Sequence, residues 1–363
     1  YRRPPGTVLY VLYVLGSLLS FGSAADPLYS AFEILKMLRM YLLFWVIYQW
    51  FRSAKDFQVM YYSIGAAMMY IFTIILKQKY LEGMWQARGP FPHQNSLVMY
   101  ANLFNCLLFA YVLHHPHKKK WLLIVSFGFW CAGMLCTIFT FSRGGLLFLG
   151  VGLGIVLLFS LQPKQINARK IGVLCLAGIA ALGIGIKAAD SIQERFETAP
   201  EESMEVRAVL AIAALKMVKD KPLGVGLNQF GLKINPPYPY GDHIPRQKVS
   251  DPYAEEEKGG LVETIYLMIA AECGWHTLAV YLIFVWSFVF RAARMYFRVQ
   301  HPFVKMWGLG LGAGLVSILC NSCFEWVLKQ SNNYYQLMAV FALILALERM
   351  SCQKKLTKAR GLA

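Results

Sequence analysis

Three charged residues in this sequence are of the right type for chemistry on an anionic substrate: Arg143, Arg207 and Glu263. A guanidinium group binds a phosphate or a carboxylate through two parallel hydrogen bonds. Arg143 precedes two glycines, which allow a sharp turn and the close approach of another group. Arg207, taken alone, would be an ordinary surface residue. Glu263 has apolar neighbours, a setting in which a carboxylate can act as an acid or a base, although a merely solvated carboxylate would look the same.

Two further cations, Lys36 and Arg39, lie one helical turn apart and near an acid, Glu33. One interpretation is an ion pair between Glu33 and Lys36, with the long side chains reaching toward the membrane surface. The alternative is that Lys36 and Arg39 share a helix face and present their charges to an anionic headgroup. The sequence favours neither.

The elements that must position these residues are membrane helices. Apolar residues make up 57% of the chain and charged residues only 15%, whereas soluble domains carry about 25% charged residues. We therefore predict an all-α fold, a polytopic transmembrane bundle of about ten or more spans. The run after Pro5 has no signal-peptide cleavage site and is expected to be the first span. The expected spans are 7–23, 34–50, 57–76, 96–114, 121–141, 144–161, 171–187, 274–290, 306–322 and 334–348.

The basic residues predict how these spans are oriented. If both termini are cytoplasmic, most lysines and arginines of the short loops fall on the cytoplasmic side, as the positive-inside rule requires. The few basic residues of the short outer loops are then Lys77, Lys79, Arg88, Arg143 and Lys329. This orientation divides the chain into helices one to seven with short loops (1–187), a large external loop that contains short helices and the candidate residues (188–273), and the last three helices with a basic cytoplasmic tail (274–363).

Two local patterns predict how the external loop is built. The amphipathic stretch 206–218 is expected to form a helix that stops at Pro222, Gly224 and Gly226. The apolar stretch 261–290 predicts a helix of about 45 Å, longer than the roughly 30 Å of a bilayer core. We therefore expect its first three turns, with Glu263 on them, to stand at or above the outer surface.

Several other functions are disfavoured by the sequence. The lysines at 118–120 are better explained as a cytoplasmic signal than as a nucleic-acid patch, so no nucleic-acid partner is expected. The chain has no Walker A motif and no Asp-x-Asp pair, which disfavours an ATP-driven pump and a metal-bound diphosphate. The pair Cys320 and Cys323 has no companion ligands, and the acidic run 255–257 leaves calcium as a minor possibility. We expect no metal and no cofactor.

Four segments, in order along the chain, resemble motifs of the O-antigen ligase and polymerase family of bacterial membrane glycosyltransferases. They are 88–95, with Arg88 and Asn95; 141–145, with Arg143; Arg207 followed by 219–230; and 263–275, with Glu263 and Tyr266. The similarity covers about residues 30–350. One position departs from the pattern: the family usually has a catalytic histidine where this sequence has Glu263, and Thr264 replaces the usual asparagine.

The resemblance implies inverting transfer of a glycan from an undecaprenyl-diphosphate carrier to an acceptor hydroxyl at the outer face of the bacterial inner membrane. The acceptor would be linked to a lipid or to a glycan. Arg143 and Arg207 would hold the diphosphate, and Glu263 would take the proton, because a carboxylate is ionised at neutral pH and can accept one. The expected substrate contacts are Lys36, Arg39, Arg88, Asn95 and Tyr266.

Several alternatives stay open. The acceptor could be a core sugar, as for a ligase, a growing polysaccharide, as for a polymerase, or a protein. A glutamate in place of histidine is also compatible with a lipid-linked glycan transporter or a scaffold without activity.

Overall fold

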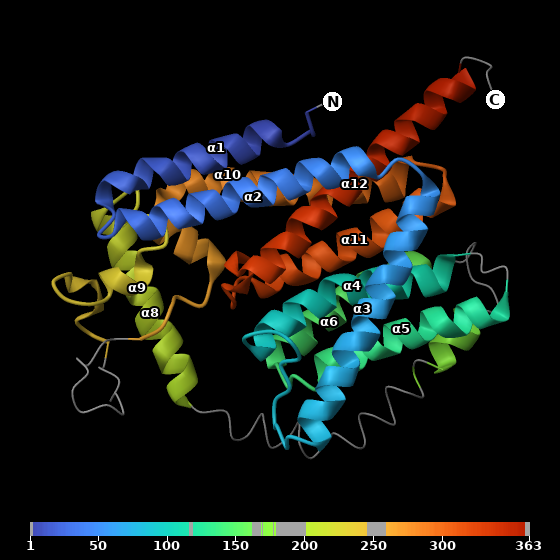
Figure 1. Cartoon of the computed structure of the whole chain (residues 1–363), viewed down its shortest axis with the longest axis horizontal. Helices are drawn as coiled ribbons and strands as arrows, with labels where there is room; N and C mark the ends of the chain where they lie inside the picture. The colour runs from blue at the N-terminus through green and yellow to red at the C-terminus, as the bar shows by residue number, and fades with distance from the viewer. Residues whose placement is uncertain are drawn as a thin grey trace. The chain divides into compact units, whose positions relative to one another are not determined.

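The computed structural model describes residues 3–115, 119–161, 168, 170–176, 178, 201–244 and 259–359. In this part of the chain every regular element is a helix, which confirms the predicted all-α class. The elements are α1 (Thr7–Leu19), η1 (Ser20–Ser23), α2 (Pro27–Trp50), α3 (Ala54–Tyr80), α4 (Gln94–His114), α5 (Lys120–Ile138), α6 (Arg143–Ser160), α8 (Glu201–Asp220), α9 (Phe230–Lys233), η3 (Pro239–Gly241), α10 (Ile265–Arg298), α11 (Pro302–Asn321), η4 (Val327–Lys329) and α12 (Ser331–Ala359) (Figure 1).

Seven helices of the described ranges are long and apolar enough to cross a membrane: α3, α4, α5, α6, α10, α11 and the Ser331–Cys352 part of α12. Each overlaps one of the expected spans, and the expected spans 121–141, 144–161 and 306–322 run one to three residues past the ends of α5, α6 and α11. The run 7–23 forms a shorter apolar helix, and the run 34–50 lies within α2, which carries Glu33, Lys36 and Arg39. The expected span 171–187 lies largely outside the described residues. The multi-span character is confirmed, and the number of about ten stays a prediction.

The chain folds into two compact units, each built from three separate stretches of sequence. Unit 1 comprises Tyr1–Val46, Pro200–Ser287 and Ser322–Met338, and unit 2 comprises Ile47–Ala199, Phe288–Asn321 and Ala339–Ala363. Unit 1 therefore joins α1 and most of α2 to α8 and the segments that follow it, and unit 2 holds most of the candidate spans. The division into 1–187, 188–273 and 274–363 describes an order across a membrane and stays a prediction.

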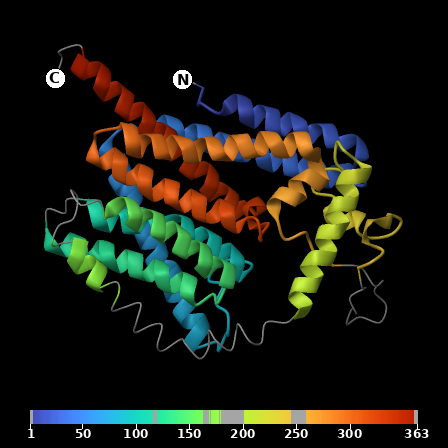
Figure 2. The ribbon, with the colours of Figure 1, turned by 180° about the vertical axis from the view of Figure 1, so that it is seen from behind.

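Helix α4 is the centre of unit 2. It packs against α5, α6 and α11, and 94% of its most apolar stretch is buried, as expected of a helix that is apolar on all sides. Its two buried amides hold neighbouring helices: Asn102 donates to the carbonyl of Gly145 (2.7 Å) and Asn105 to that of Gly133 (3.1 Å). Figure 2 shows the bundle from behind, with α6 beside α11.

Helices α1 and α2 run side by side in unit 1 (Figure 1). The Tyr10 hydroxyl donates to the Met37 carbonyl (2.7 Å) and also contacts the hydroxyl of Tyr334 (2.8 Å). The start of α2 is held by Gln229, whose side-chain oxygen accepts hydrogen bonds from the amides of Ala25 (3.0 Å) and Asp26 (2.9 Å). A residue of the predicted external loop thus satisfies backbone donors just before a helix, as a capping group does.

The packing of α4 on α11 predicts a difference between two glycines. A Cβ added at Gly314 would lie 2.4 Å from the Leu103 carbonyl, whereas one at Gly154 on α6 would meet nothing within 4 Å. Gly314→Ala should therefore lower the free energy of unfolding by about 1–3 kcal/mol through overpacking. Gly154→Ala, the matched control, should be neutral or slightly stabilising. Thermal unfolding in detergent measures both, and equal midpoints would contradict the assigned helix contact.

Candidate functional site

The segment after α8 is fixed by backbone contacts with α10. Helix α8 ends at Asp220, close to the predicted stop. The amides of Val225 and Gly226 then donate to the carbonyls of Ala271 and Glu272, both at 3.0 Å. Gly224 has φ +97°, and a Cβ there would lie 2.2 Å from the Glu272 carbonyl. Glycine is therefore required for a close approach of two backbones as well as for the turn.

The start of α10 differs from the predicted helix. Glu263 lies in the connection before α10, which begins at Ile265, so the expectation that it stands on the helix's first turns was wrong. The reason is a tertiary contact: the Thr264 hydroxyl and the Ile265 amide both donate to the Ser322 carbonyl, each at 3.3 Å. The long apolar helix is also interrupted, because Gly274 has the non-helical angles φ 84° and ψ 163°.

Arg207 and Glu263, both predicted from the sequence, form an ion pair. The Nη2 atom of Arg207 lies 2.7 Å from Oε2 of Glu263 and 3.7 Å from Oε1 of a third residue, Glu325. The side chains of Arg207 and Glu263 are 40% and 34% exposed, whereas that of Glu325 is 10% exposed. Segments far apart in the sequence thus bring one cation between two carboxylates.

The guanidinium of Arg207 makes few contacts within the cluster of Arg207, Glu263 and Glu325. Both carboxylates are paired with the same atom, Nη2, and Nε of Arg207 is buried without a hydrogen-bond partner among the described residues. An unpaired buried donor costs about 1–3 kcal/mol, and an ion pair this exposed stabilises by only about 0–1 kcal/mol. The cluster is therefore suited to exchanging partners.

A second charged cluster in unit 1 is more buried. Lys329 Nζ lies 2.5 Å from Oε2 of Glu272, whose other carboxylate oxygen accepts from the Phe230 amide (3.3 Å). Lys36 pairs with Glu33 at 2.6 Å and donates to the Lys329 carbonyl at 3.1 Å. Burial alone would lower the pKa of Lys329, but the carboxylates of Glu272 and Glu33 outweigh it and hold that pKa above its ordinary value.

This second cluster decides part of one question that the sequence left open. The ion pair between Glu33 and Lys36 is present, as the first alternative predicted. Arg39 lies with its guanidinium 5.1 Å from the centre of the Tyr335 ring. The headgroup role of Lys36 and Arg39 stays a prediction. Tyr266 lies in the first turn of α10, with its ring 6.4 Å from that of Tyr281.

The other candidate residues belong to unit 2. Arg143 is the first residue of α6, directly after the N-cap Ser142, whose hydroxyl accepts from the Gly145 amide (3.3 Å). A Cβ at Gly145 would lie 2.5 Å from Val98, so the Ser-Arg-Gly-Gly turn also packs closely on α4.

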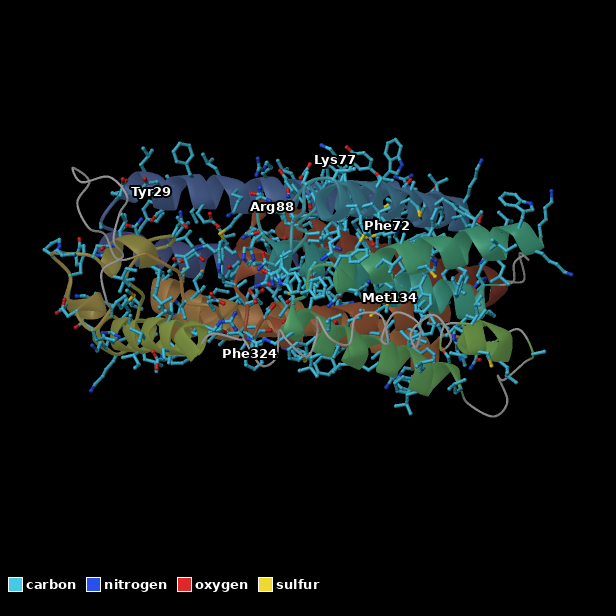
Figure 3. The ribbon with its side chains drawn as sticks, turned by 90° about the horizontal axis from the view of Figure 1, so that it is seen from below. Tyr29, Phe72, Lys77, Arg88, Met134 and Phe324 are labelled. Atoms are coloured by element: carbon cyan, nitrogen blue, oxygen red, sulfur yellow. The ribbon has the colours of Figure 1, made fainter. Side chains whose placement is uncertain are left out.

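Arg88 and Asn95 lie on either side of the turn that leads from α3 into α4. The exposed side chain of Arg88 (Figure 3) donates to the Pro92 carbonyl at 3.2 Å. Asn95 lies in the first turn of α4, and its backbone N–H donates to Nδ1 of His93 at 3.2 Å. Gln78 fixes this turn by accepting from the amide of Gly89 at 2.8 Å.

Sequence reasoning missed Glu325 and gave Glu272 and Lys329 no catalytic or binding role. A signal existed for the last two. Lys329 is one of the few basic residues predicted in a short outer loop, and Glu272 lies in the segment 263–275 that carries a family motif. Glu325 offered only its place between two apolar runs, which is common for a solvated acid.

The described part of the chain holds no group of three His, Cys, Asp or Glu side chains that could bind a metal ion. Cys320 and Cys323 are free thiols. The acidic run 255–257 lies outside the described residues.

Comparison with known families gives one match: residues 127–282 fit the family described as O-antigen ligase. This segment is similar to the O-antigen ligase family. It contains Arg143, Arg207, Glu263 and Glu272, and it confirms the resemblance predicted from the motifs. The family implies a membrane protein with glycosyltransferase-like ligase function and lipid-linked glycan substrates. No curated protein matches the sequence.

The segment that matches the family ends before Lys329, so its buried Glu272 is paired with a cation from outside the matched range. Removing one partner of a buried ion pair costs about 3–5 kcal/mol. We therefore predict that Lys329→Met lowers the free energy of unfolding by about that amount, and that Glu272→Gln together with Lys329→Met recovers part of the loss.

The exposed pair Lys77–Glu82 serves as the control, since its side chains are 65% and 41% exposed. Lys77→Met should change stability by less than about 1 kcal/mol. Denaturant or thermal unfolding of all variants in one detergent provides the comparison. If Lys329→Met lowered the free energy of unfolding no more than Lys77→Met does, the buried pair would contribute no more to stability than the exposed one.

Proposed function

We propose that this protein transfers a glycan from an undecaprenyl-diphosphate carrier to an acceptor hydroxyl, with inversion and without a metal ion. The observation that carries the proposal is the contact between Arg207 and Glu263 within the segment that matches the O-antigen ligase family. A diphosphate leaving group and a hydroxyl nucleophile require a cation and a proton acceptor side by side. These two residues supply both.

In the proposed reaction the acceptor oxygen forms a bond to the anomeric carbon while the bond from that carbon to the phosphate oxygen breaks. The carboxylate of Glu263 takes the proton of the acceptor hydroxyl, and the carrier diphosphate leaves with the bonding electron pair. Arg207 and Arg143 stabilise the negative charge that develops on the diphosphate, which is the kind of electrostatic contribution that dominates many enzymes. Attack opposite the leaving group inverts the anomeric centre.

The remaining predicted residues are proposed as substrate contacts. Lys36, Arg39 and Arg88 would contribute cations, and Asn95 and Tyr266 would donate hydrogen bonds. The positive-inside distribution supports a location in the bacterial inner membrane with cytoplasmic termini and a periplasmic active site.

Ligase, polymerase and protein-modifying activities would all use the same two reacting groups and would differ in the acceptor. The rival proposal is a transporter or scaffold. It is supported by the ion pair itself, since a glutamate already paired with Arg207 could be purely structural. Activity of Glu263 variants separates the two.

The arginines should be necessary for transfer. Arg207→Ala and Arg143→Ala are each expected to lower the transfer rate by about 10²–10³-fold, the loss typical of removing one group that stabilises the developing charge. Lysine replacements should recover little, because an ammonium lacks the planar two-pronged geometry. Transfer by purified protein in liposomes, assayed with EDTA present, measures this and also tests metal independence. Full activity of Arg207→Ala would refute the diphosphate role.

Glu263→Gln should lose about 10²-fold or more in single-turnover transfer, because the amide keeps the shape of the side chain but cannot accept the proton. Glu263→His should retain measurable activity, since histidine is the base that the resemblance implies for relatives. An unchanged rate for Glu263→Gln would leave Glu263 structural. Wild-type inactivity with carrier-linked glycan would favour the transporter or scaffold.

A further inference from the structure

We propose that Glu325, together with Glu263, holds Arg207 in the empty site as an internal competitor of the donor's diphosphate, and that donor binding releases Glu263 to act as the base. This inference rests on the proposed function and assigns a positioning role to Glu325. Its basis is the position of one guanidinium between two carboxylates from different segments of the chain.

The contacts of Arg207 show why a diphosphate could displace the two carboxylates from its guanidinium. Both carboxylates are paired with the same guanidinium atom, Nη2, at 2.7 Å and 3.7 Å. Nε has no hydrogen-bond partner among the described residues. A phosphate group matches the planar fork of a guanidinium and can pair two of its nitrogens at once. Rotation of Arg207 toward a diphosphate would therefore exchange a one-atom contact for a two-atom contact.

Charge explains why one carboxylate must leave. A carboxylate beside the guanidinium repels an incoming diphosphate, because like charges at short range disfavour each other. Glu325 is the more buried of the two, with 10% of its side chain exposed against 34% for Glu263. Glu263 can therefore return to water at lower cost when the donor takes its place.

Hydrogen bonds to one backbone carbonyl join the segment that carries Glu325 to the segment that carries Glu263. Glu325 lies between α11 and η4, and Glu263 lies directly before α10. Their segments are joined because the Ser322 carbonyl accepts from both the Thr264 hydroxyl and the Ile265 amide. The position of Glu325 is thus tied to the segment that carries Glu263.

This arrangement has a consequence for the order of events. While Glu263 is paired with Arg207, Oε2 of its carboxylate lies 2.7 Å from the guanidinium, which takes the place that an acceptor hydroxyl would need. Once a diphosphate takes the guanidinium, that oxygen becomes available to the acceptor hydroxyl. The donor therefore prepares the base, and the acceptor reacts second.

The test is the affinity for farnesyl diphosphate, a short polyprenyl diphosphate without a glycan, measured on purified protein in detergent. Glu325→Gln removes the competing charge and keeps the side-chain shape. We expect its dissociation constant to fall by about two- to fivefold, the range expected for losing a partly exposed ionic competitor. Glu263→Gln should shift it in the same direction, which gives an independent check if Glu325→Gln folds poorly. Arg207→Ala should weaken binding.

The matched control is Glu82→Gln, which removes the same charge from the ion pair with Lys77 and leaves the Arg207 cluster intact. Its dissociation constant should equal that of the wild type. Inorganic pyrophosphate as a competitor shows whether the diphosphate itself is recognised, and phosphatidylglycerol in the micelle shows whether any anionic headgroup suffices.

Each outcome has a defined meaning. Unchanged or weaker binding by both Glu325→Gln and Glu263→Gln, with wild-type binding intact, overturns the competitor role and leaves the proposed transferase function standing. Binding by Arg207→Ala as tight as that of the wild type, or no binding by any of these proteins, overturns the proposed function as well.

Discussion

The close backbone approach between Gly224 and Glu272 is the constraint on which the site in unit 1 depends. A Cβ at Gly224 would lie 2.2 Å from the Glu272 carbonyl, so the segment after α8 can reach α10 only with glycine at this point. The contact fixes where α8 ends relative to the start of α10, and therefore where Arg207 stands relative to Glu263. Gln229, a few residues later, joins the same segment to the start of α2. One short motif thus holds three helices in register.

Burial separates the two charged clusters of unit 1 into different roles. Lys329 and Glu272 have side chains that are 14% and 3% exposed. The Glu272 carboxylate also accepts from the Phe230 amide, and the Lys329 carbonyl accepts from the side chain of Lys36. Such a pair is costly to break and unsuited to exchange with a ligand. Arg207 and Glu263 are far more exposed, and their guanidinium has an unused donor. The same kinds of residue therefore support structure in one place and are available for chemistry in the other.

The replacement of histidine by Glu263 changes the electrostatics of a site of this type. A neutral imidazole would not neutralise Arg207, whereas a carboxylate pairs with it at 2.7 Å. In the proposed reaction a glutamate base would have to separate from the cation before it takes the proton, and this requirement motivates the competitor role that we propose for Glu325. Glu325 places a second carboxylate 3.7 Å from the same guanidinium atom.

The sequence by itself determined the all-helical class, most of the spans and the stop of α8, because each depends on apolar runs or on residues a few positions apart. It left the ion pair between Glu33 and Lys36 as one of two alternatives, and the structure shows that pair. It also carried the family motifs at Arg143, Arg207 and Glu263. Only the tertiary structure decided that α10 begins after Glu263, since that start is set by the distant Ser322 carbonyl. It also decided that Glu325 joins Arg207 and that Lys329 neutralises Glu272. These pairs link residues 57 or more positions apart, and no local periodicity records which distant charges meet when a chain folds.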